Sequence, residues 1–193
     1  TEFEQVEGVN TEQKLIKTVN MSAETTEFDT LVADVRAKTE SAGGYVESSD
    51  VGGNYGGDTT RYAYLVLRIP AEKLDDFVGG VKDASNVRTF SESTEDVTLQ
   101  YTDMDTHIKA LREELDALFS MMEQATSMKD ILSIQSQITD VRYEIESYES
   151  QLRVYDNQVT YSTVYLDLYE VNRESSTTGT TFGERVKAKF NDN

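Results

Sequence analysis

Two runs of apolar residues of equal length constrain the fold of this chain more than any other feature. In both runs the apolar positions are separated alternately by three and four residues, which is the spacing of a heptad repeat. The first run consists of Tyr101, Met104, Ile108, Leu111, Leu115, Leu118, Met122 and Ala125. The second consists of Ile131, Ile134, Ile138, Val141, Ile145, Tyr148, Leu152 and Tyr155. Only a short segment separates the runs, so we predict a long antiparallel helical hairpin of the coiled-coil type over residues 99–157.

The hairpin has two possible arrangements. Arms of matched length can bury their apolar seams against each other, and the hairpin then needs no partner. Alternatively, Tyr148, Tyr155 and the polar flanks support association of two hairpins into a four-helix dimer. We therefore expect a monomer or a weak dimer.

Residues 14–98 show the patterns of a sheet with two helices. Alternating apolar residues predict strands over residues 14–21, 45–51, 60–69 and 87–92. Two stripes with helical spacing lie between them: Phe28, Leu31, Val32 and Val35, and then Leu74, Phe77, Val78 and Val81. This order is typical of a ferredoxin-like split βαβ antiparallel sheet. A further strand over residues 158–171 completes the sheet, so the hairpin is an insertion and the predicted fold class is α+β.

The two ends of the chain differ from the rest in composition. Residues 1–13 are predicted to be a flexible acidic arm, and residues 172–193 a linker with a basic amphipathic juxtamembrane end. That end carries Phe182, Val186 and Phe190 together with Arg185, Lys187 and Lys189. We expect the chain to be a domain excised from a longer protein.

The charge of the chain limits its partners. With 36 acidic and 18 basic residues, its formal net charge is −18. Such a negative field repels the phosphate backbone, which argues against nucleic-acid binding. The absence of cysteine removes disulfides, thiolate metal sites and cysteine nucleophiles.

Catalytic and metal-binding patterns are weak. Asp103 and His107 could share a helix face as metal ligands, with Asp105 between them, but two ligands do not make a site. Acidic residues near a helix N-terminus are explained equally well by the helix dipole. We predict no metal and no cofactor. The many carboxylates permit some acid pair for glycosidase chemistry, so a cell-wall hydrolase is the residual enzymatic alternative to a non-enzymatic protein.

A group of tyrosines provides the candidate binding residues. These fall on the strand faces opposite the aliphatic core: Tyr62, Tyr64, Tyr161, Tyr165 and Tyr169. If the two strands pair, the rings form a surface suited to a glycan, a peptide or another protein, because tyrosine combines apolar area with a hydroxyl. The alternative is that the hairpin or the N-terminal arm covers the rings, or that they pair across strands for stability.

Several phrases of the sequence resemble a family of bacterial envelope proteins known as domain of unknown function family 4349. They are Gly43-Gly44-Tyr45-Val46-Glu47, Leu67-Arg68-Ile69-Pro70-Ala71-Glu72-Lys73, Glu95-Asp96-Val97-Thr98-Leu99-Gln100-Tyr101-Thr102-Asp103, Glu144-Ile145-Glu146-Ser147 and Gln158-Val159-Thr160-Tyr161-Ser162-Thr163. The resemblance implies a membrane-anchored protein with a lipoprotein or membrane signal, a C-terminal transmembrane helix and this domain outside the cytoplasm. It implies no catalytic residues. Basic juxtamembrane residues more often mark the cytoplasmic side, so the orientation stays open.

These observations predict an extracytoplasmic, non-enzymatic interaction or sensing module of an anchored bacterial envelope protein. In this interpretation the hairpin projects a contact surface or transmits force. The alternative is a glycan- or peptide-binding module that uses the tyrosines.

Overall fold

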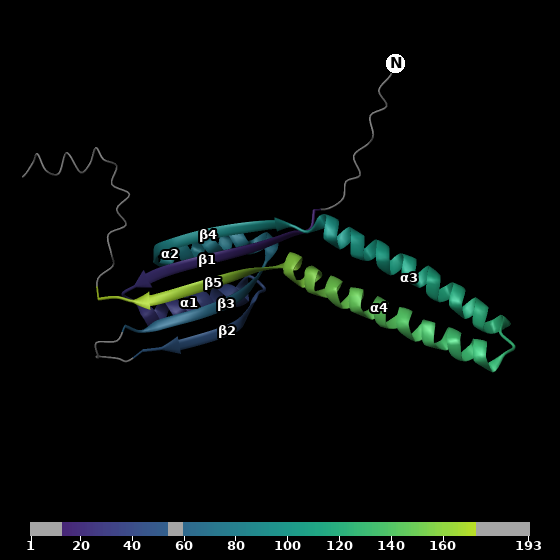
Figure 1. The fold of residues 1–193 in the computed structure, drawn as a ribbon. Coiled ribbons are helices and arrows are strands. Elements are labelled where there is room, and N and C mark those ends of the chain that lie inside the picture. The colour runs from purple at the N-terminus through teal and green to yellow at the C-terminus, as the bar shows by residue number, and fades with distance from the viewer. Residues whose placement is uncertain (1–12, 54–59, 173–193) are drawn as a thin grey trace, which may run out of the picture. The chain divides into compact units, whose positions relative to one another are not determined.

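The computed structural model describes residues 13–53 and 60–172, and its elements follow one another in the predicted order (Figure 1). They are β1 (Leu15–Thr25), α1 (Phe28–Ser41), β2 (Tyr45–Gly52), β3 (Tyr62–Pro70), η1 (Ala71–Lys73), α2 (Leu74–Ala84), β4 (Asn86–Asp96), α3 (Thr98–Gln124), α4 (Met128–Thr160) and β5 (Tyr161–Glu170). The protein is therefore of the α+β class. The predicted acidic arm and the predicted linker with its basic end lie, except for residues 13 and 172, outside the described residues.

The described residues divide into two compact units. A sheet unit contains residues 18–53, 60–92 and 163–172, and a helical unit contains residues 13–17 and 93–162. Each unit is described by itself below.

The five strands form one mixed sheet in the order β2-β3-β5-β1-β4. The prediction of an antiparallel sheet is wrong for one pair, because β1 and β5 run parallel while β2 and β3 run antiparallel. In this register Val164 lies beside Val19 and Leu166 beside Met21, so the apolar residues of both strands stay on the same face. The direction of β5 could not be read from the sequence, since a connection as long as two helices can return the chain either way.

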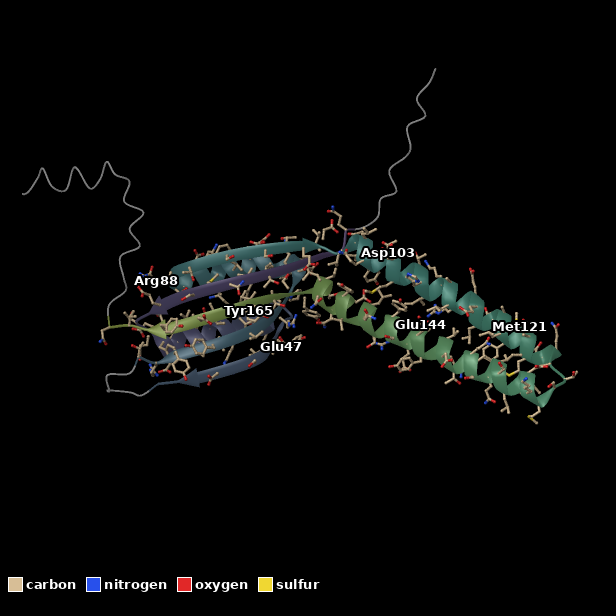
Figure 2. The ribbon with its side chains drawn as sticks, viewed as in Figure 1. Glu47, Arg88, Asp103, Met121, Glu144 and Tyr165 are labelled. Carbon is tan, nitrogen blue, oxygen red and sulfur yellow. The ribbon has the colours of Figure 1, made fainter. Side chains whose placement is uncertain are left out.

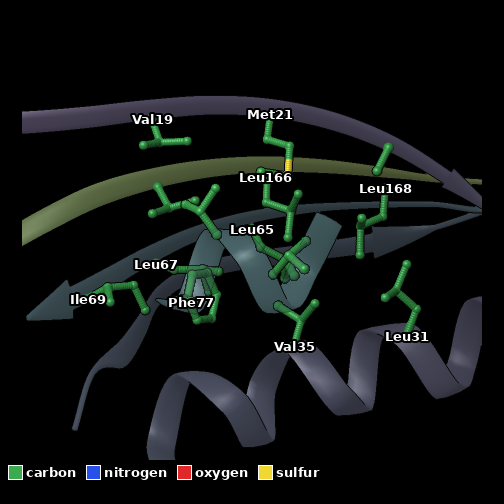
Figure 3. Close-up of a cluster of buried hydrophobic side chains, with 14 of the residues drawn as sticks. Val19, Met21, Leu31, Val35, Leu65, Leu67, Ile69, Phe77, Leu166 and Leu168 are labelled. Atoms are coloured by element: carbon green, nitrogen blue, oxygen red, sulfur yellow. The ribbon is translucent and has the colours of Figure 1, made fainter. Parts of the chain in front are cut away.

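One apolar core holds the sheet unit together. Both predicted helical stripes are confirmed, because α1 and α2 pack them into a single cluster with the inward residues of β1, β3 and β5 (Figure 3). The inward residues of these strands are Val19, Met21, Ala23, Ala63, Leu65, Leu67, Ile69, Val164, Leu166 and Leu168. Val32 is partly buried in this cluster, and the other residues of the two stripes are buried. Both helices lie behind the sheet in Figure 1, so the core is on one face.

The helical unit consists mainly of α3 and α4, which pack against each other along the two predicted apolar runs. Leu118, Ile138 and Val141 are buried, and five partly buried residues extend this cluster: Leu111, Leu115, Met122, Ile134 and Ile145. Helix α4 ends at Thr160 and β5 begins at Tyr161, so no loop separates them. Within the described ranges, no helix is both long and apolar enough to cross a membrane.

Candidate functional site

The face of the sheet opposite α1 and α2 carries the predicted tyrosines. Because side chains alternate along a strand, burial of Leu65 and Leu67 turns Tyr64 and Val66 to the other side. The same alternation in β5 turns Tyr165 and Asp167 away from the core. Tyr64 is 40% exposed and Tyr165 is 45% exposed. We call this surface the tyrosine face and define it by Tyr45, Tyr62, Tyr64, Arg68, Tyr165, Asp167 and Tyr169. Figure 2 shows the sheet from this side, with Tyr165 and Glu47 labelled.

Three of the rings form a contiguous group. The centroids of Tyr62 and Tyr64 lie 4.8 Å apart with the rings tilted by 33°. Tyr64 and Tyr169 meet edge to face, with their centroids 6.2 Å apart. Both spacings are within the range of favourable aromatic pairs. The rings thus support one another and hold a fixed aromatic surface that spans β3 and β5.

A hydrogen bond with Tyr64 raises the pKa of the Tyr169 hydroxyl to about 12, and burial and the neighbouring Asp167 act in the same direction. The Tyr169 hydroxyl therefore stays protonated at physiological pH. A protonated phenol can both donate and accept a hydrogen bond. The ring group consequently offers apolar area together with polar atoms at its rim.

Arg68 organises the other end of the tyrosine face. Its Nε and Nη2 donate to the two carboxylate oxygens of Glu47 at 3.0 and 3.1 Å, and its Nη1 donates to Thr163 Oγ1 at 2.7 Å. The hydrogen bonds with Glu47 raise the pKa of Arg68, and the nearby Tyr45 and Tyr165 also raise it. Arg68 thus links β2, β3 and β5, and its charge is already paired.

Asp167 is the carboxylate of the ring group. It is half-buried and lies two residues from both Tyr165 and Tyr169 on β5. Burial raises the pKa of its carboxyl group. Among the described residues it makes neither a hydrogen bond nor an ion pair with a side chain. The fold therefore holds this carboxylate partly desolvated, and no cation of the described part of the chain pairs with it.

A second arginine, Arg61, lies beside the C-terminal end of β5. It donates through Nε and Nη2 to both oxygens of Glu170 at 2.7 and 2.6 Å and through Nη1 to Asp29 at 3.0 Å. Its guanidinium also lies 4.7 Å from the ring centroid of Phe28. Arg61, the residue before β3, thus joins β5 and the first turn of α1, and we assign it a structural role.

The Arg61–Glu170 pair leads to a prediction about acid stability. The hydrogen bonds from Arg61 hold the pKa of Glu170 below its usual value of 4.5. A lowered pKa contributes stability above the pKa of the unfolded state, and this contribution is lost as the pH falls through the folded value. Glu170→Gln should therefore lower the urea midpoint at neutral pH, and the difference from the parent should close below about pH 4. Urea titrations over this pH range measure it. Glu92→Gln, at an exposed position of β4, is the control, and an equal effect of both variants would contradict the assignment.

The five predicted site residues do not all belong to the tyrosine face. Tyr62, Tyr64, Tyr165 and Tyr169 do, and the strand order places β3 beside β5, which is the condition under which these rings can form one surface. Tyr161 is the first residue of β5 and belongs to the helical unit, so we do not include it.

The alternation along β3 and β5 already indicates from the sequence that Arg68 and Asp167 face the same side as the tyrosines, although neither is among the predicted site residues. Sequence reasoning missed Tyr45. Tyr45 pairs with Arg68 at the edge of the sheet. A register shift between Val46 and Ser48 breaks the alternation of β2, so counting along the strand does not reveal which side Tyr45 faces.

Two of the three residues considered for a metal site on α3, His107 and Asp105, have other partners. The ring of His107 stacks on Tyr148 with the centroids 5.5 Å apart, and Lys109 Nζ pairs with Asp105 at 2.6 Å. Over residues 13–53 and 60–172, no group of three or more histidine or acidic side chains could hold a metal ion.

The sheet unit is thus an α+β domain with helices on one face and exposed tyrosines on the other. Residues 13–193 match the family described as Domain of unknown function (DUF4349), and the chain belongs to this family. Comparisons with curated proteins and with solved structures found no match.

Proposed function

We propose that this chain is a non-enzymatic binding module that takes its ligand on the tyrosine face. The observation that carries the proposal is the exposure of Tyr64 and Tyr165, at 40% and 45%, on a face that the helices of the sheet unit do not cover. Large aromatic side chains are enriched where proteins bind peptides and glycans, because a rigid ring contributes much contact area and loses little entropy. The ligand class in this proposal is a peptide or a glycan.

The cellular location of this module is also part of the proposal. The family resemblance implies a membrane-anchored bacterial envelope protein with this domain outside the cytoplasm, and we propose that location. The net charge of −18 is compatible with a well-solvated domain at a surface.

The helical hairpin provides a second candidate function, as an arm that projects a contact surface or transmits force. We propose that it is an antiparallel coiled coil. Two cross-helix pairs support this: Arg112 with Glu149 at 2.7 Å, and Phe119 with Arg142 at 5.9 Å from the ring. In the heptads defined by the apolar runs, all four residues occupy the position directly after the second apolar residue, where a coiled coil places its flanking contacts.

We further propose that the first four strands and their helices form a ferredoxin-like split βαβ arrangement into which β5 is inserted. The order β2-β3-β5-β1-β4 supports this. Removing β5 leaves β2-β3-β1-β4, in which each helix connects two strands that have one other strand between them.

The tyrosine face is tested by binding to peptide and glycan arrays. Wild-type protein should bind ligands of one array, and Tyr64→Ala with Tyr165→Ala should weaken that binding at least about tenfold, because the loss of a central aromatic contact typically costs 2 kcal/mol or more. Tyr143→Ala is the matched control, since this tyrosine is 76% exposed on α4.

Two results would contradict the proposal. One is equal loss of binding in the control, which would place the ligand elsewhere. The other is hydrolysis of cell-wall glycan by the purified protein, which would make it an enzyme. Far-ultraviolet circular dichroism of each variant shows whether the fold is intact.

A further inference from the structure

The pairing of the strands places Tyr64 between two carboxylates. On β2, Asp50 is directly opposite Tyr64. On β5, the bond from the Glu170 N–H to the Arg61 carbonyl sets the register. Counting three residues back from Glu170 along β5 and three residues forward from Arg61 into β3, which runs the opposite way, puts Asp167 opposite Tyr64. Residues directly opposite in a sheet have side chains on the same face. The exposed ring of Tyr64 is therefore flanked by an aspartate on each side.

The described basic side chains around these aspartates already have partners. Arg68 is bound to both oxygens of Glu47, and Arg61 to both oxygens of Glu170. Arg88 lies 4.0 Å from Glu24, a carboxylate that also accepts a hydrogen bond from Asn86 at 2.8 Å. Neither Asp50 nor Asp167 makes an ion pair with a described residue. The centre of the tyrosine face thus has negative charge that the sheet unit does not balance.

Rings and unbalanced carboxylates together define the chemistry of a suitable ligand. A cation over a tyrosine ring is attracted by the negative face of the ring, and a carboxylate beside it adds a charge-assisted hydrogen bond. An anionic ligand would instead be repelled by the two aspartates and by the net charge of −18. The same net charge would draw a basic partner towards the protein.

We propose that the tyrosine face binds a basic peptide segment in extended form, with a lysine or arginine side chain seated on Tyr64 between Asp50 and Asp167. This inference rests on the proposed function and names its ligand class. The rings of Tyr62, Tyr165 and Tyr169 cover the alkyl stem and the neighbouring peptide residues. An extended peptide matches the face because its alternate side chains repeat every 6.6 Å or so, as do Tyr165, Asp167 and Tyr169 along β5.

The test uses the full chain and two short fluorescein-labelled peptides, one with alternating lysine and serine and one with glutamine at each lysine position. Fluorescence anisotropy measures their affinities. We expect the lysine peptide to bind at least about tenfold more tightly, and this preference to shrink at high salt. Asp167→Asn should weaken lysine-peptide binding about tenfold, and Asp50→Asn less, because Asp50 is more exposed. Asp140→Asn, at an exposed position of α4, should have no effect.

The stability of the Asp167 variant separates a binding role from a structural one. Burial disfavours the ionised form of this carboxyl group, so Asp167→Asn should leave the urea midpoint unchanged or raise it slightly. Loss of binding together with unchanged or increased stability supports the proposal. Loss of both would make Asp167 a structural residue and overturn it.

The remaining outcomes separate this inference from the proposed function. Equal affinity for both peptides, with weakening by Tyr64→Ala but not by Asp167→Asn, overturns the inference and leaves the tyrosine face as a binding site. Binding of a glycan but of neither peptide also overturns the inference and leaves the tyrosine face as a binding site. No binding of any peptide or glycan overturns both proposals.

Discussion

Leu166→Ala is expected to lower the free energy of unfolding of the sheet unit by about 3 kcal/mol, within the range of 2 to 5 that leucine-to-alanine changes cost in well-packed cores. Leu166 is completely buried and lies in β5, between the strands β3 and β1. It faces the same core as the stripes of α1 and α2. Because it is surrounded by packed side chains, its neighbours can fill the cavity left by alanine only in part.

Tyrosine fluorescence in a urea titration is the appropriate measurement, since the chain has 11 tyrosines and no tryptophan. The matched control is Val51→Ala in the edge strand β2, where the side chain is 50% exposed and the loss should stay within about 0.5 kcal/mol. A loss for Leu166→Ala no larger than that of the control would mean that β5 does not occupy the centre of the sheet.

Ile138→Asp is expected to separate α3 from α4 and to remove most of the helical circular dichroism signal. Ile138 is 6% exposed in the apolar cluster with Leu118 and Val141. A carboxylate at this position would be buried without a partner in the middle of the apolar cluster, which costs several kcal/mol. Isolated helices without tertiary packing are only marginally stable in water, so both should unfold.

The signal at 222 nm measures this effect well. Helices α3 and α4 have 27 and 33 residues, whereas α1 and α2 have 14 and 11. Ser136→Asp introduces the same charge at an exposed position two residues away and should leave the signal unchanged. If both variants kept their helicity, the assignment of the seam would be wrong.

Local patterns predicted the elements of this fold because each element carries its own periodicity. The stripe of Leu74, Phe77, Val78 and Val81 has the spacing of a helix, and all four residues are buried in α2. The alternation in β3 likewise assigned Leu65 to the core and Tyr64 to the opposite face. Four of the five tyrosines were thus located before the tertiary structure was known.

The periodicity of each element could not predict which strands, far apart in sequence, pair with each other. The sequence shows that residues 161–170 form a strand, but its place between β3 and β1 depends on which edges are available when it arrives. The register shift in β2 hid Tyr45 for a related reason, since one extra residue reverses the side that every later residue faces. The partners of Arg68 could not be predicted either, because Glu47 and Thr163 come from strands far apart in sequence.

The position of β5 sets the order in which the protein can be assembled. The strand that joins β3 to β1 is the last element of the described chain, and it is separated from β1 by more than a hundred residues, including both long helices. Pairings this distant in sequence form late, because a long loop must close before they add any stability. During synthesis, β3 and β1 therefore each keep an open edge until residues 161–170 leave the ribosome. The unfinished chain is most exposed to aggregation just before that point, because the strand that fills the centre of the sheet is the last one to be made.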